Sequence, residues 1–160
     1  MSTVAVTGFI EAHAVDVWRL LTDLPGRAAR LSAAGPVELL TPGPFGPGTA
    51  WREARTQPGG GTVTEEFLVV EARAPHLLVL CSSGAGVDYR ITWNLRSVRR
   101  RRRGCTAVTV TQEAVPNGPY GRVVALLLGG LAARAVEVAL RRDLADLALA
   151  AGATGSVEAA

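Results

Sequence analysis

The most constraining feature of the sequence is residues 37–115, about 80 residues in which short strand patterns follow one another with no helical pattern between them. β-Branched and aromatic residues alternate loosely with polar ones, and clusters of Gly and Pro separate the runs. Another strand pattern at residues 3–11 precedes this stretch. The sequence therefore predicts seven strands, at residues 3–11, 37–40, 49–56, 62–72, 77–82, 87–98 and 105–115.

Two short helices are predicted between the first two strands. Ala14, Val17, Trp18 and Leu21 have the i, i+3, i+4, i+7 spacing of one helical face, and we expect Trp18 to pack this helix onto the sheet. Pro25 ends that pattern but can begin another helix, predicted over residues 26–33.

A long helix is predicted at the end of the chain, from about residue 120 to 151. Val136, Leu140, Leu144 and Leu147 share one face of its second half. Residues 123–128 are apolar on every side, so this turn is expected to be covered, or to face a cavity or a partner. We expect one domain over residues 1–152 and a disordered tail at 153–160.

Charge and motifs exclude several function classes. All 17 basic side chains are arginine, for a net charge of +3, and the absence of lysine excludes Schiff-base chemistry. His13 and His76 lack the spacing of a metal site, and no serine or cysteine triad, phosphate-binding loop or dinucleotide fingerprint is present. No cofactor or metal is therefore expected. The apolar run at 123–133 is too short to span a membrane, and no signal peptide is recognisable, so a cytoplasmic location is expected.

The glycine-rich segment 57–61 predicts a hairpin that fixes which side chains share a face. Pairing residue 55 with 63 places one set on the same side of the sheet: Trp51, Glu53, Arg55, Val63, Glu65 and Phe67. The two aromatic residues favour the inner side. Arg55 would then lie between Glu53 and Glu65, with donors left for a ligand oxygen.

This set has two interpretations. It is either a polar anchor in an apolar ligand pocket or an ion-pair network at the rim of the sheet that contributes only solubility. A register shift of one residue would turn the whole set outward.

Alternation in the next hairpin predicts a second inward set. Val87, Tyr89, Ile91, Trp93 and Leu95 share one face of their strand, and Thr106, Val108 and Val110 share one face of the following strand. Tyr89 and Trp93 each combine a large apolar surface with one polar group, so they are candidates either for a ligand anchor or for ordinary core packing. A phenol in a pocket could also act as a general acid.

Residues 99–103 are five consecutive arginines at the predicted tip of this hairpin. Such a run could bind phosphates. Without interleaved aromatic residues and with a net charge of only +3, a solvated loop is the expected role and nucleic acid is not an expected partner.

Three segments carry a family resemblance. Residues 10–23 read IEAHAVDVWRLLTD, residues 48–55 read GTAWREAR, and residues 140–147 read LRRDLADL. They resemble, in turn, the strand-to-helix entry of the SRPBCC superfamily, the third strand of its bacterial polyketide cyclase/dehydrase branch, and its terminal helix. His13 stands where this family commonly has a proline.

The resemblance implies an α+β helix-grip fold, in which a curved antiparallel sheet wraps around the C-terminal helix with an apolar cavity between them. The implied ligand is a small hydrophobic molecule of polyketide, aromatic or lipid type. The side chains expected to contact it are Trp51, Phe67, Tyr89, Ile91, Trp93, Val108, Leu127 and Leu131.

Three functions remain open: a binding module for such a ligand, a cyclase or aromatase acting on a poly-carbonyl chain, and a protein-interaction module. In the second, Arg55, Glu53, Glu65 or Tyr89 would assist proton transfer. The third would use residues 123–128 or the arginine run. A homodimer is a further possible assembly.

Overall fold

The structure is a computed structural model that describes residues 2–84 and 86–158, apart from the side chains of 119–129 and 154–158. Its elements are β1 (Ser2–Ile10), α1 (Ala14–Thr22), α2 (Arg27–Arg30), β2 (Ala34–Leu39), β3 (Ala50–Thr56), β4 (Thr62–Arg73), β5 (Leu77–Gly84), β6 (Val87–Arg100), β7 (Arg103–Pro116) and α3 (Pro119–Glu158). The predicted element order is confirmed.

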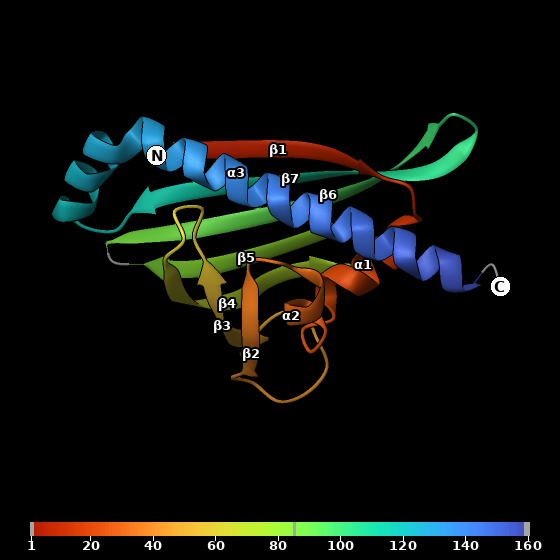
Figure 1. The fold of residues 1–160 in the computed structure, drawn as a ribbon. Helices are drawn as coiled ribbons and strands as arrows, with labels where there is room; N and C mark the ends of the chain where they lie inside the picture. The colour runs from red at the N-terminus through yellow and green to blue at the C-terminus, as the bar shows by residue number, and fades with distance from the viewer. Residues whose placement is uncertain (1, 85, 159–160) are drawn as a thin grey trace.

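The seven strands form one antiparallel sheet in the order β1-β7-β6-β5-β4-β3-β2. The sheet curves, and α3 crosses the side that we call its inner face (Figure 1). The connection between the two edge strands is made by α1 and α2. The predicted α+β helix-grip architecture is therefore confirmed.

Several element boundaries differ from the prediction, and strand β2, for example, begins three residues earlier than expected. Helix α2 covers only four residues, because Leu31 already has extended backbone angles. The β6–β7 hairpin closes more tightly than expected, with Arg100 paired to Arg103. Helix α3 continues to Glu158, past the end predicted near residue 151.

The core lies between the inner face and the helices. From α3 come Leu140, Leu144 and Leu147, as the helical spacing predicted. Helix α1 contributes Val17 and Leu21, while Trp18 is partly buried against the same cluster. Burial of these apolar side chains holds the helices on the sheet.

The register of the β3–β4 hairpin is as predicted. Arg55 pairs with Val63, Glu53 with Glu65, and Trp51 with Phe67. Because Trp51 and Phe67 are both buried, this set lies on the inner face.

Candidate functional site

The inner face is tightly packed at one end and open at the other. On β6, the inward side chains of Leu95 and Trp93 are 3% and 5% exposed, whereas Ile91 and Tyr89 are only partly buried. The neighbouring strand β7 follows the same trend, with Val108 and Val110 buried and Gln112 and Ala114 partly exposed. We call these the closed end (Trp93, Leu95, Val108 and Val110) and the open end (Tyr89, Ile91, Gln112 and Ala114).

A buried ion-pair network joins β3 to the helices. The Arg27 guanidinium donates to both Glu53 carboxylate oxygens, Nε to Oε2 at 2.7 Å and Nη2 to Oε1 at 3.1 Å. Both side chains are almost fully buried. This bidentate pairing fixes α2 against the sheet.

Arg55 extends the network to α3. Its Nη2 donates to the Asp143 oxygens at 2.9 and 3.2 Å, and its Nη1 donates to Glu53 Oε1 at 3.3 Å. The predicted position of Arg55 between two carboxylates is correct, but the second carboxylate is that of Asp143. Glu65, the predicted partner, makes no hydrogen bond or ion pair among the described residues.

Trp51 packs against this network with both its ring and its N–H group. The ring stacks on Phe67 with 5.2 Å between centroids, and the Arg27 guanidinium lies 5.6 Å from the Trp51 ring centroid. The indole Nε1 donates to Glu53 Oε2 at 3.3 Å. Glu53 therefore accepts hydrogen bonds from three different side chains.

The pKa values of the carboxyl groups around Arg55 are shifted in opposite directions. Burial alone would raise the pKa of Glu53, but hydrogen bonds and charge from Arg27 and then Arg55 hold it below its usual range. Burial raises the pKa of Glu65, with Arg55 opposing and Glu53 adding to the rise. It also raises the pKa of Asp143 against the opposing charges of Arg55 and Arg27. Burial would lower the pKa of Arg55, yet Asp143 and Glu53 raise it, so Arg55 stays charged.

The other residues predicted to contact a ligand lie in different parts of the molecule. Trp93 and Val108 belong to the packed core at the closed end, and Tyr89 and Ile91 lie at the open end. Leu131 is 78% exposed, so its predicted place in the cavity is wrong. It precedes Leu140 by nine residues, and at 3.6 residues per turn this places it on the opposite side of α3. Leu127 and the rest of residues 123–128 lie outside the described side chains.

Four polar residues on the inner face or on the helices against it were not predicted from the sequence. Arg27 and Asp143 complete the network, and Ser82 and Gln112 lie at inward positions beside Tyr89 and Ile91. The sequence pattern does mark Asp143, because this charged residue interrupts the apolar face formed by Leu140, Leu144 and Leu147. Gln112 also continues the inward alternation of Val108 and Val110.

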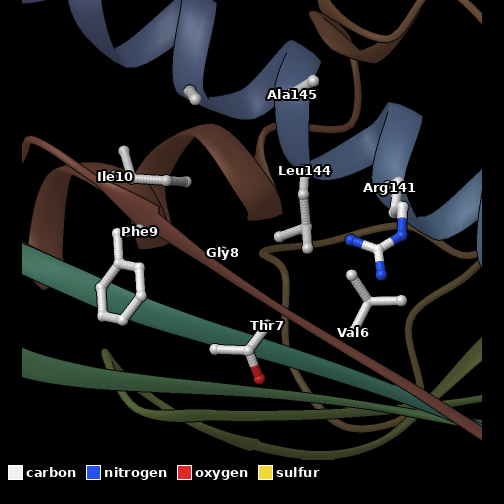
Figure 2. A pocket seen from close by; sticks show the side chains of 9 residues that line it. Val6, Thr7, Gly8, Phe9, Ile10, Arg141, Leu144 and Ala145 are labelled. Atoms are coloured by element: carbon white, nitrogen blue, oxygen red, sulfur yellow. The ribbon is translucent and has the colours of Figure 1, made fainter.

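A groove among the described residues lies outside the predicted site. Its volume is about 240 Å³, and it lies between the edge strand β1 and α3. Figure 2 shows Leu144 and Arg141 of α3 on one side of it and Val6 and Thr7 of β1 on the other. It is smaller than typical pockets for drug-sized ligands. A second space, of about 10 Å³ beside Arg27 and Trp93, has room for roughly one water molecule.

Two kinds of site are not found in the described part of the chain. No group of three His, Cys, Asp or Glu side chains is placed to hold a metal ion. No described helix is long and apolar enough to cross a membrane.

A seven-stranded antiparallel sheet curved around a long C-terminal helix defines a helix-grip protein of the SRPBCC type. The chain belongs to the family described as "Polyketide cyclase / dehydrase and lipid transport", whose model matches residues 1–152. The resemblance seen in the sequence is therefore confirmed. Comparison with curated proteins gives no significant match.

Solved structures with the same fold include two aromatase/cyclases. The di-domain ARO/CYC BexL of the BE-7585A biosynthetic pathway is 20% identical, with a TM-score of 0.66 over 93% of this chain and 50% of BexL. This chain thus spans about half of BexL. The Zhui aromatase/cyclase of Streptomyces sp. R1128 is 19% identical, with a TM-score of 0.68 over 94% of this chain and 93% of Zhui.

The protein TTHA0849 of Thermus thermophilus is 22% identical, with a TM-score of 0.63 over 92% of this chain and 98% of that protein. At these identities, the three structures establish the fold alone.

Proposed function

We propose that the protein binds a small, largely apolar molecule between α3 and the open end of the inner face. The observation that carries this proposal is the contrast along β6, where inward side chains pass from buried Leu95 and Trp93 to partly exposed Ile91 and Tyr89. The partly exposed side chains at the open end have surface left with which to contact a bound molecule. Membership of a family described by polyketide cyclases and lipid transport supports the same class of ligand.

Polar groups at the open end suit a ligand that carries oxygen atoms. Ser82 pairs directly with Tyr89, and Gln112 pairs with Ile91, so these side chains lie together on the inner face. Among the described residues, the side chains of Ser82, Tyr89 and Gln112 make no hydrogen bonds. They can therefore donate to carbonyl oxygens or accept from hydroxyl groups of a bound molecule.

The proposed site uses the predicted residues in two ways. Phe67, Tyr89 and Ile91 would contact the ligand. Trp51, Trp93 and Val108 would form the rigid wall behind it. Leu127 remains a proposed contact from α3.

The experiment combines native mass spectrometry with fluorescence titration. Freshly purified protein is first examined for a copurified small molecule, and the emission of 8-anilinonaphthalene-1-sulfonate (ANS) is then followed on addition of protein. Ile91→Trp should fill the open end and weaken ANS binding, whereas Asn94→Trp adds an indole to the exposed opposite face of β6 and should not. If both variants bind ANS as the original chain does, the ligand site is not at the open end.

A second function is favoured by Glu65. This carboxyl is directed to the inner face, lacks an ion-pair partner among the described residues, and has a pKa raised by burial. A protonated carboxyl there could act as a general acid toward a carbonyl oxygen of a poly-carbonyl chain, with Tyr89 orienting that oxygen. Arg55 and Glu53 would not transfer protons, because both are committed to the network.

The cyclase function makes a prediction that simple binding does not. Glu65→Gln should keep ligand affinity and abolish conversion of a poly-carbonyl substrate to its cyclised product, as followed by mass spectrometry. If Glu65→Gln converts the substrate at the original rate, the cyclase proposal is wrong and the binding proposal stands.

A further inference from the structure

The tip of the β6–β7 hairpin combines an unfavourable turn with a dense positive charge. The two residues of the turn, Arg101 and Arg102, have φ angles of 50° and 64°. Positive φ at both positions is the type I′ pattern, which favours Asn-Gly and disfavours residues with long side chains. The sequence thus places arginine where the backbone favours a different residue.

The charges at the tip are also uncompensated. All five residues of the run 99–103 are exposed, and none has a carboxylate partner in the described part of the chain. Some exposed arginines elsewhere are paired, as Arg19 is with Asp16 and Arg141 with Glu137, and the ones unpaired among the described residues, such as Arg90 and Arg134, do not stand next to further arginines in the sequence. Mutual repulsion adds to the cost of the turn. When the residue types of a segment disfavour its own backbone conformation and place like charges together, a functional reason is expected.

Apolar side chains are exposed around the same end of the molecule. Phe9 is 49% exposed, with the Arg100 guanidinium 4.3 Å from its ring centroid. Gly104, near the tip of the hairpin, lies against His13, which directly precedes α1, and Val15 in the first turn of α1 is 44% exposed. Figure 1 shows the later part of α3 at this end too, and its Leu149 is 74% exposed.

We propose that this end, comprising the arginine tip with Phe9, Val15 and Leu149, docks on an anionic lipid bilayer. Arginines are attracted to acidic headgroups, and apolar side chains among them can enter the interface. A nucleic acid would use the guanidinium groups but would have no use for exposed Val15 and Leu149. Docking here leaves the open end, at the other end of β6, facing away from the bilayer.

The proposal does not depend on ligand binding, and its test is vesicle cosedimentation of the full chain. The original chain should sediment with vesicles of 30% phosphatidylserine in phosphatidylcholine at 0.1 M NaCl, and not with phosphatidylcholine alone. The double variant Arg101→Asn, Arg102→Gly gives the turn its preferred residues and removes two charges. We expect about 30-fold weaker partitioning, from the loss of two arginines at the surface.

The same variant should be more stable, with a melting temperature raised by a few degrees, because the strained turn is relieved. A loss of binding therefore cannot come from unfolding. The matched control is Arg90→Gln, Arg134→Gln, which removes two exposed charges away from the tip and should sediment nearly as the original does.

Three outcomes would overturn the proposal. The first is that the original chain sediments equally with anionic and neutral vesicles. The second is that the tip variant sediments as strongly as the control. The third is that a 20-base-pair DNA duplex binds the original chain more tightly than the vesicles do, and that the tip variant loses this binding. The last outcome would assign the tip to nucleic acid instead.

Discussion

The two ends of the inner face are built from the same strands, yet they differ in how their polar groups are satisfied. Next to the closed end, charged side chains are buried in a network in which Glu53 and Asp143 each face an arginine. At the open end, the inward side chains of Ser82, Tyr89 and Gln112 make no hydrogen bonds among the described residues. Buried polar groups usually have partners, so this difference separates a finished structural core from a surface available to a ligand.

The network also shows why the closed end can serve as a rigid wall. Glu53 of β3 connects Arg27 of α2 to Arg55, and Arg55 connects to Asp143 of α3. Three elements far apart in the sequence are thus joined by charged hydrogen bonds. Such a network favours one arrangement of helices on the sheet, because any other leaves a charge buried and unpaired.

The largest predicted effect comes from breaking this network. Glu53→Gln leaves Arg27 buried without its countercharge and should cost about 3–5 kcal/mol of unfolding free energy, measured by urea denaturation. The control, Glu66→Gln, removes an exposed partner of Arg52 from the other face of the sheet and should change stability little. Equal effects of the two substitutions would show that the network is no more important than a surface ion pair.

A direct comparison of the two ends uses one strand. Leu95→Ala should destabilise the protein by about 2–5 kcal/mol, because the closed end is packed on all sides and cannot fill the cavity. Ile91→Ala should cost clearly less and should instead alter ligand binding. Urea denaturation of both variants measures the contrast. Similar losses of stability would mean that the open end is packed like the closed one.

The sequence predicted the sheet well because strand patterning is local. The hairpin at residues 57–61 fixed the register, so the shared face of Trp51, Glu53 and Arg55 followed from alternation alone. The assignment of inward residues on β6 and β7 followed in the same way. These predictions needed no knowledge of how the helices dock.

Only the strand residues of the network could be predicted from the sequence, because the positions of the helix residues depend on how the helices dock on the sheet. Asp143 carried a signal as a charge within the apolar face of α3, but its partner depends on how that helix crosses the sheet. Arg27 carried none, since a four-residue helix is too short to show periodicity. Strand alternation alone therefore predicts Glu65 as the second partner of Arg55, a position that the structure gives to Asp143.

A smaller effect is expected at Glu65, which lies next to the network but outside it. Its pKa is raised in the folded state, so its ionised form costs stability above that pKa, and the cost disappears as pH falls below the unfolded value of about 4.3. Glu65→Gln should therefore stabilise the protein at pH 7 by less than about 1 kcal/mol, since the side chain is partly exposed.

Urea denaturation at several pH values tests this sign. The advantage of Glu65→Gln over the original chain should shrink between pH 7 and pH 4. The pH dependence of the Glu53 contribution has the opposite sign, because the pKa of Glu53 is lowered in the folded state and its stabilising contribution is lost as pH falls through the folded pKa. An advantage for Glu65→Gln that grows toward pH 4 would contradict the assigned environment of this carboxyl.

The smallest predicted effect concerns one hydroxyl group at the open end. Tyr89→Phe removes a hydrogen-bonding group that has no partner among the described residues, so the free energy of unfolding should not change. If a ligand oxygen hydrogen-bonds to this hydroxyl, the substitution should weaken the binding free energy by about 0.5–1.5 kcal/mol, which corresponds to roughly 2- to 10-fold weaker binding. Fluorescence titration with the molecule recovered by native mass spectrometry measures it. Thr92→Val removes a hydroxyl from the opposite face of β6 and should leave affinity unchanged, so a loss in both variants would reflect the strand rather than a contact with the ligand.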